Sequence, residues 1–210
     1  MKSNGFILVE LLIGVVIATL CMLMMLSLFK QTTQIGIASS HDAEYDAQIQ
    51  IGLLVAQKFI QNAGYGSGLS NDIILVSSTS IPTLYWRFIP LISQTPITYK
   101  CQGIVEKIVS DHSTYLHRLV LIKKNCGSTT DWQTGTWEED QTLATIRSSK
   151  SDPIFQYSLA AQNCTPYGID NNNAKGLKQL TISAQREHIT GTVTGSTVKN
   201  TVCLNNILNV

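Results

Sequence analysis

Three features of the sequence could do chemistry: a carboxylate inside an apolar stretch, a glycine just before it, and a set of cysteines further along. Glu10 is the single charged residue between Phe6 and Phe29. A charged side chain in hydrocarbon costs about 2.5–3.5 kcal/mol, so such residues are rare and usually functional. Gly5 ends a short polar leader that carries Lys2. Together these residues indicate a cleavage site and a carboxylate that needs a positively charged partner.

The segment Gly5-Phe6-Ile7-Leu8-Val9-Glu10 resembles the class III signal of type IV prepilins. The resemblance implies that a prepilin peptidase removes residues 1–5 and methylates the new N-terminal amine of Phe6. It also implies that Glu10 pairs with the N-terminal amine of a neighbouring subunit during filament assembly. An unpaired carboxylate is costly in lipid, and an ammonium group in the next subunit would offset that cost.

Three other interpretations of this segment explain less of it. A plain membrane anchor accounts for Leu11 to Phe29, since about 20 residues cross a bilayer, but it leaves Gly5 and Glu10 unexplained. A secretory signal peptide has a shorter apolar core, of about 7–15 residues, and a small-x-small cleavage site that this chain does not offer. A lipoprotein signal has a cysteine just after the apolar core, whereas Cys21 lies within it.

The elements that position these residues begin with a helix. The first 63 residues contain no proline, and we expect one helix over residues 6–63, about 85 Å long at 1.5 Å per residue. Residues 6–30 are apolar on all sides, as a membrane-spanning or filament-core segment is. Residues 31–63 become amphipathic, with a face suited to packing on a sheet. The residues of this face are Ile49, Leu53, Ala56, Ile60 and Ala63.

Residues 64–210 form the predicted globular domain. The glycine-rich segment Ala63–Gly68 ends the helix, and the pattern then changes to that of β-strands bounded by Gly, Pro, Asn and Ser. The predicted strands are 73–77, 83–89, 97–102, 104–109, 116–124, 142–146, 154–159, 177–184, 189–194 and 197–204, with a hairpin turn at Thr194–Ser196. The sequence thus predicts an α+β fold in which the long helix packs on a mainly antiparallel sheet, as the resemblance to type IV pilins also implies.

Four of the five cysteines fall in this domain: Cys101, Cys126, Cys164 and Cys203. An even number in an oxidising compartment argues for two disulfides, for which three pairings exist. We favour Cys101–Cys126, because two predicted strands joined near residues 111–113 place these cysteines at the open end of a hairpin. The other pair is then Cys164–Cys203. No CxxC or His–Cys spacing favours zinc instead.

Little else in the sequence indicates a reactive site. The chain has no GxSxG, P-loop, GxGxxG or HExxH motif, and we expect neither an enzyme nor a cofactor. Charged residues make up 14% of the chain with a formal net charge of +1, which gives no strong field for nucleic acid. Asp170–Asn173 is rich in oxygen ligands for calcium, but such residues also favour turns for local reasons.

For the histidine and tryptophan side chains, the sequence predicts structural positions and not reactive sites. His112 and His117 flank a predicted turn and are expected at the surface or within that turn. Trp132 and Trp137 belong to an aromatic and acidic loop. Tryptophan is enriched in binding hot spots, but we favour the interpretation in which these side chains cover the edge of a core.

A second resemblance lies at the end of the helix. Gln61-Asn62-Ala63-Gly64-Tyr65 is similar to the Arg-x-Ala-Gly-Tyr-like stretch that closes the helix of PilW-type minor pilins, although the arginine is missing. Pseudopilin J of type II secretion shares much of this layout. The resemblance implies a non-enzymatic minor pilin that primes pilus assembly or lies near the tip. It would support twitching motility, adhesion or DNA uptake.

The partners and location also follow from the resemblance. It implies contacts with other minor and major pilins, prepilin peptidase and the pilus assembly platform. The chain would first lie in the inner membrane with a cytoplasmic leader and then in the extracellular pilus; charge alone leaves the orientation open, because Lys2 and Lys30 flank the apolar segment. Two alternatives remain: a pseudopilin of a type II secretion system, and a membrane-anchored binding module that does not polymerise.

Overall fold

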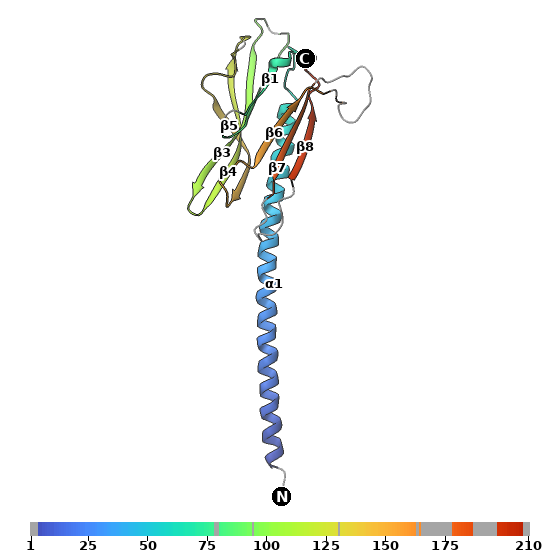
Figure 1. Cartoon of the computed structure of the whole chain (residues 1–210), viewed down its shortest axis with the longest axis vertical. Helices are drawn as coiled ribbons and strands as arrows, with labels where there is room; N and C mark the ends of the chain where they lie inside the picture. Colours follow the sequence, from blue (N-terminus) through green and yellow to red (C-terminus); the bar gives the residue numbers. More distant parts are fainter. Residues whose placement is uncertain are drawn as a thin grey trace. The chain divides into compact units, whose positions relative to one another are not determined.

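The computed structural model describes residues 4–77, 80–93, 95–129, 131–162, 164, 178–186 and 197–207. Contacts divide the chain into two compact units, of which the first ends at Glu44 and the second begins at Tyr45. One helix, α1 (Asn4–Ile60), supplies the first unit and continues into the second (Figure 1). The division falls within the segment 31–63 that the sequence predicts to be amphipathic.

The first unit is the apolar part of α1. Its large side chains from Leu8 to Phe29 are between 49% and 71% exposed. The hydroxyl of Thr19 donates to the carbonyl of Val16 at 2.9 Å, so this polar group does not need water. In the part of the chain that the structure describes, α1 is the one helix long and apolar enough to cross a membrane.

Glycines end α1 as the sequence predicts, although the last helical residue is Ile60 rather than Ala63. Turns follow from Gln61 to Ser67. Gly64 has a φ of +75°, a backbone conformation that side chains with a Cβ rarely adopt. A Cβ at Gly64 would also meet the carbonyl oxygen of Asn206 at 3.1 Å. Position 64, where the chain turns away from the helix, therefore favours glycine over any other residue.

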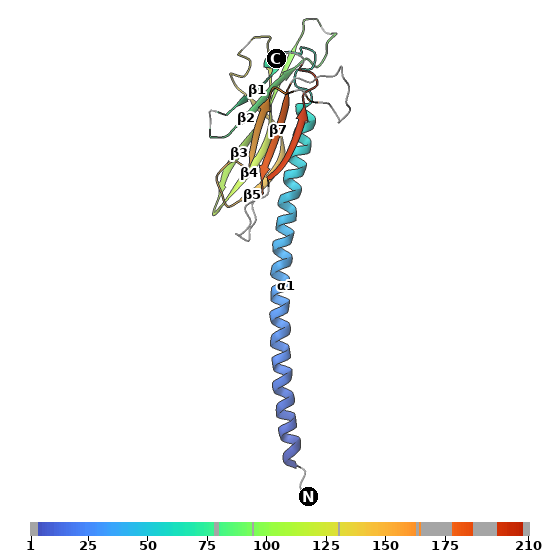
Figure 2. The same ribbon diagram turned by 45° about the vertical axis from the view of Figure 1, so that its right-hand side comes forward.

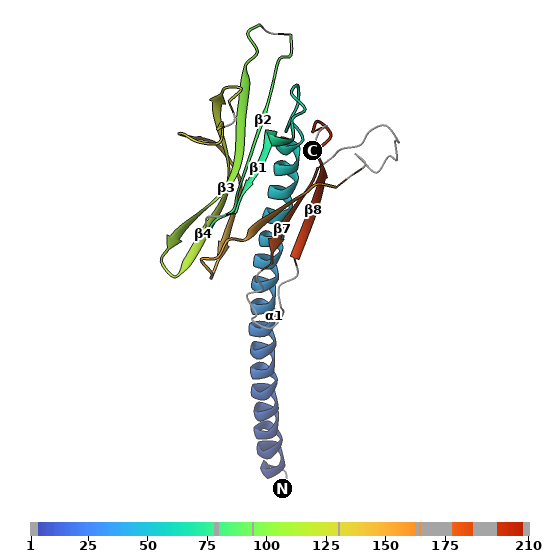
Figure 3. The same ribbon diagram turned by 45° about the horizontal axis from the view of Figure 1, so that its top comes forward.

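The described residues of the second unit contain two antiparallel sheets. The first sheet has the order β1-β2-β3-β4-β5 and the second the order β6-β7-β8. A short 3-10 helix, η1 (Ser70–Asp72), precedes them. The strands are β1 (Ile73–Val76), β2 (Thr83–Phe88), β3 (Tyr99–Asp111), β4 (Thr114–Cys126), β5 (Glu138–Ser148), β6 (Phe155–Ala160), β7 (Gln179–Gln185) and β8 (Thr197–Cys203). Figures 2 and 3 show both sheets beside the last turns of α1.

The α+β architecture with a long helix on antiparallel strands is thus confirmed, with three differences of detail. The predicted strands 97–102 and 104–109 are one strand, because β3 pairs with β4 without interruption from Tyr99↔Cys126 to Asp111↔Thr114. The strands form two sheets rather than one. β5 is longer than the predicted 142–146. The predicted strand 189–194 and the turn after it lie outside the described residues.

The core lies where the sequence places it. The five predicted residues of the helix face are all buried: Ile49, Leu53, Ala56, Ile60 and Ala63. Trp86 and Leu119 of the first sheet and Phe155 and Ile182 of the second belong to the same buried cluster. One helix face therefore joins the two sheets, and each large buried side chain contributes about 1.5–3 kcal/mol of hydrophobic stabilisation.

Gly52 is a position where α1 packs tightly against the first sheet. A Cβ there would lie 2.8 Å from the Cβ of Ala144, whereas a Cβ at Gly36 in the same helix would meet nothing within 4 Å. We predict that Gly52→Ala lowers the free energy of unfolding by up to about 2 kcal/mol. Overpacking costs about 1–3 kcal/mol, and the higher helix propensity of alanine returns about 1 kcal/mol.

Urea unfolding of the full chain in detergent, followed by tryptophan fluorescence, measures this effect. Gly36→Ala is the matched control, because it makes the same change in the same helix without the contact, and it should not lower stability. A Gly52→Ala chain as stable as the Gly36→Ala chain would show that the approach to Ala144 is not tight.

Candidate functional site

The residues expected to be processed or to guide assembly all lie near the start of α1. Gly5, Phe6 and Glu10 are part of the helix, and Glu10 is exposed. Glu10 forms no ion pair within the described part of the chain. Its carboxylate is thus available to a partner outside that part.

The distance to other charges strengthens this point. The next cationic residue after Glu10 along α1 is Lys30. At 1.5 Å per residue it lies about 30 Å further along the helix, too far for an ion pair. No other charged residue occurs between the two. An apolar surface therefore carries one isolated carboxylate near its N-terminal end.

The second candidate region is the outer face of the first sheet, where one disulfide lies. Cys101 and Cys126 form a disulfide with a Cα–Cα distance of 5.8 Å. They lie on adjacent strands at the open end of the β3–β4 hairpin, where Cys126 pairs in register with Tyr99, two residues before Cys101. This is the pair that the sequence favours. The chain then leaves Cys126 in a loop that runs to β5.

The second disulfide joins Cys164 to Cys203, with a Cα–Cα distance of 5.6 Å. Cys203 is the last residue of β8 and pairs in register with Gln179 of β7. The disulfide therefore ties the segment before β7 to the end of the second sheet, as expected. The remaining cysteine, Cys21, is free and exposed on α1.

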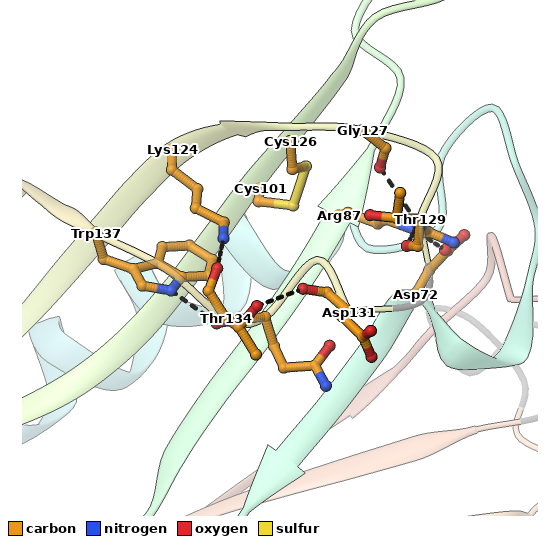
Figure 4. Close-up of a disulfide and its surroundings, with 11 residues drawn as sticks. Asp72, Arg87, Cys101, Lys124, Cys126, Gly127, Thr129, Asp131, Thr134 and Trp137 are labelled. Atoms are coloured by element: carbon orange, nitrogen blue, oxygen red, sulfur yellow. Dashed lines mark hydrogen bonds and ion pairs between the residues drawn. A yellow bond between two sulfur atoms is a disulfide. The ribbon is translucent and has the colours of Figure 1, made fainter.

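A buried ion pair anchors the loop that leaves Cys126. We call residues 127–137 the cover loop; all of them except residue 130 are described. Arg87 of β2 is 2% exposed and its Nε donates to Oδ1 of Asp72, which is fully buried, at 2.5 Å. Its Nη1 donates to the carbonyl oxygens of Thr129 at 3.0 Å and Gly127 at 3.5 Å (Figure 4). One guanidinium group thus holds η1 and the cover loop together.

Two aromatic rings pack against the guanidinium group of Arg87 and help to bury its charge. The guanidinium carbon of Arg87 lies 5.2 Å from the ring centre of Tyr99 and 5.6 Å from that of Trp132. Asp72 also accepts hydrogen bonds from the hydroxyl of Ser67 and, at 3.2 Å, from the amide of Leu69. A buried charge is tolerated only when it is paired and hydrogen-bonded in this way. These groups form a clamp in which both carboxylate oxygens of Asp72 and the Nε and Nη1 of Arg87 are hydrogen-bonded.

The far end of the cover loop packs on the same face of the sheet. The ring of Trp137 lies 4.8 Å from that of Tyr85, and Nζ of Lys124 lies 4.8 Å from the centre of the Trp137 ring. Lys124 also donates to the carbonyl oxygen of Thr134 (Figure 4), and burial lowers the pKa of Lys124 below its usual range. Trp132 is 2% exposed. The tryptophans therefore cover the outer face of the first sheet, whereas the sequence predicts that they cover the edge of the core.

His117 corrects an expectation. The sequence places it at the surface or in a turn, but it lies in β4 and is fully buried against Glu106 of β3. His112 does lie in the turn and is exposed, with a φ of +56°. His117 is buried because it occupies the inward side of β4, two residues from the buried Leu119. That alternation was a usable signal in the sequence.

The sequence gives no comparable indication that Arg87 and Asp72 are buried. Arg87 alternates with inward-facing Trp86 and Phe88, so the strand pattern places it on the outer face. It is buried only because the cover loop returns across that face. No group of three or more His, Cys, Asp or Glu side chains that could hold a metal occurs among the described residues. The calcium candidate Asp170–Asn173 lies outside them.

Comparisons of the chain with protein-family models, with curated proteins and with solved structures found no match. Any assignment of function therefore depends on the residues and geometry of this chain.

We predict that Arg87→Met lowers the free energy of unfolding by about 3–5 kcal/mol, because removing one partner leaves a buried carboxylate without its cation. Urea unfolding of the full chain in detergent measures the change. Arg87→Met combined with Asp72→Asn should recover part of the loss, since the lone charge is then gone.

Lys107→Met provides the matched control, because the Lys107–Glu139 ion pair on the same sheet has both side chains more than 40% exposed. Exposed pairs contribute little, and this variant should unfold like the wild type. Equal stabilities of the Arg87→Met and Lys107→Met chains would contradict the clamp.

Proposed function

We propose that this chain is a non-enzymatic minor pilin, a structural subunit of a type IV pilus that primes assembly or lies near the tip. The observation that carries the proposal is Glu10: an exposed carboxylate, without an ion-pair partner in the described chain, on a helix of exposed apolar side chains. The preceding Gly5-Phe6 junction supplies the cleavage site that the prepilin resemblance requires.

The physical basis of assembly is that the apolar half of α1 needs an environment without water. Burial of apolar surface contributes about 25 cal/mol per Å², whether the neighbours are lipid chains or other helices. The subunit can therefore wait in the inner membrane and pass into a filament of similar helices. Lipid does not provide a counter-charge for Glu10, whereas the methylated N-terminal ammonium of a neighbouring pilin does. Glu10 thereby sets the axial register between subunits.

The globular domain provides the part of the subunit that lies outside the membrane. Two disulfides are typical of proteins that fold in an oxidising compartment. The proposed partners are the other minor and major pilins through α1, prepilin peptidase during maturation and the assembly platform. Adhesion, twitching motility or DNA uptake would then be properties of the whole pilus.

Two related roles differ from this proposal in their consequences. A pseudopilin of a type II secretion system would use the same helix and the same Glu10 in a different filament. A membrane-anchored binding module that does not polymerise would use the apolar helix but would have no need of Glu10. The role of Glu10 therefore separates filament subunits from a simple anchor.

We predict that Glu10→Ala reduces incorporation of the full-length protein into sheared surface filaments at least tenfold, which corresponds to about 1.4 kcal/mol. The reason is that the ammonium group of the neighbouring subunit loses its counter-charge. Quantitative immunoblots of the filament and membrane fractions from native cells provide the measurement.

Glu44→Ala is the matched control, because Glu44 is also exposed on α1 but lies beyond its apolar half, and this variant should assemble normally. Wild-type incorporation of the Glu10→Ala protein would contradict the proposal and favour the non-polymerising anchor. A requirement for Glu10 in protein secretion, without surface filaments, would favour the pseudopilin.

A further inference from the structure

Glu106 and His117 form a second buried pair, on the inner face of the first sheet. Their side chains are 1% and 0% exposed, and Nδ1 of His117 lies 2.6 Å from Oε1 of Glu106. In the register of β3 and β4, Glu106 pairs with Leu119 and His117 with Ile108, so the two are diagonal neighbours. Neither residue takes part in the proposed assembly of the filament.

The pair holds the segment that connects the two sheets. We call residues 149–154 the linker, because β5 ends at Ser148 in the first sheet and β6 begins at Phe155 in the second. Glu106 accepts hydrogen bonds from the amides of Ile154 and Phe155, one at each oxygen, both at 3.0 Å. Nε2 of His117 lies 2.9 Å from the carbonyl oxygen of Lys150. The two side chains thus fix both ends of the linker.

These contacts determine how many protons the pair holds. A carbonyl oxygen can only accept, so Nε2 of His117 must carry a hydrogen. A neutral imidazole has one N–H, which would leave the lone pair of Nδ1 facing an ionised carboxylate at 2.6 Å. This contact is attractive only when a proton lies between the two atoms. In addition to the hydrogen on Nε2, the pair therefore holds one titratable proton, located on either Nδ1 of His117 or the carboxyl group of Glu106.

The surroundings of the pair favour keeping this proton inside the fold. Burial and, to a lesser extent, the negative charge of Glu106 raise the pKa of Tyr157 on β6 above its usual range, so its phenol stays neutral. The neighbouring inward positions of the sheet, Ile104 and Leu119, are apolar. The charged side chains of the linker, at Lys150 and Asp152, are exposed. Water therefore has little access to either member of the pair.

We propose that Glu106 and His117 form a one-proton latch, which holds the linker between the two sheets at mildly acidic and neutral pH and releases it as the pH rises. The latch is a conformational device of the globular domain and does not depend on the proposed role in a pilus. Its loss would loosen the crossing between the sheets while the disulfides keep their connections.

The sign of the pH dependence follows from the protons bound in each state. In the unfolded chain histidine loses its proton near pH 6.5 and glutamate near pH 4.3, to about half a unit. Between these values both states hold one proton, and the pair contributes no slope. Above about pH 6.5 folding takes up one proton, so the folding equilibrium constant falls about tenfold per pH unit until the folded pair loses its proton.

Glu106→Gln tests the latch, because a glutamine amide can donate to Nδ1 of a neutral His117 without an added proton. The variant loses the hydrogen bond that Oε1 accepts from the Ile154 amide, which lowers its stability at every pH and leaves the pH slope as the measured quantity. Urea unfolding of the full chain in detergent, between pH 6.5 and 8.5, gives the folding equilibrium constant. We expect the wild-type constant to fall up to about 100-fold more than that of Glu106→Gln over these two units. His112→Gln removes the exposed turn histidine instead and should keep the wild-type slope.

A measurement on the wild-type chain covers the case in which Glu106→Gln does not fold. In chains labelled with ¹⁵N at histidine, His117 should keep a proton associated with both ring nitrogens at pH 8, where an exposed histidine has one. Hydrogen exchange, corrected for the intrinsic pH effect, should show protection of the Ile154 and Phe155 amides falling as the pH rises. An Nδ1 of His117 that shares no proton with Glu106 at pH 8, or equal slopes for wild type and Glu106→Gln, would overturn the proposal.

Discussion

The apolar surface of α1 between Leu8 and Phe29 has to be kept from water, and this constraint decides where the protein can reside. Its large side chains are about half or more exposed within the chain itself, so the chain does not bury them. Lipid and other apolar helices both satisfy this requirement. Glu10 adds the second requirement, a counter-charge, which lipid chains do not offer. A filament of similar helices with ammonium N-termini meets both needs.

In the globular unit, two small sheets pack around one face of α1. The apolar cluster contains residues of α1 and of both sheets. Two buried pairs of charged or titratable side chains hold the cover loop and the linker, which apolar packing alone does not position. Arg87 with Asp72 clamps the cover loop over the outer face of the first sheet. Glu106 with His117 holds the linker to the second sheet. Directional hydrogen bonds thus position the irregular segments.

Much of this arrangement could be predicted from the sequence, because it depends on local pattern. The helix face from Ile49 to Ile60 follows from helical spacing, and the end of α1 follows from its glycines. The β3–β4 hairpin brought Cys101 and Cys126 together as its register requires. The burial of Arg87 could not be foreseen, since it depends on a loop that returns from a distant part of the chain. The prediction for His117 is wrong because the strand alternation, and not its closeness to a turn, determines which side of β4 it occupies.

The central claim, that the chain matures as a pilin does, is tested most directly at its N-terminus. Intact mass and N-terminal sequencing of the protein isolated from its native membrane provide the measurement. The account predicts a chain that begins with N-methylated Phe6, at the mass expected for two disulfides. A chain that still begins at Met1 would contradict it and would leave an anchored binding domain as the better description.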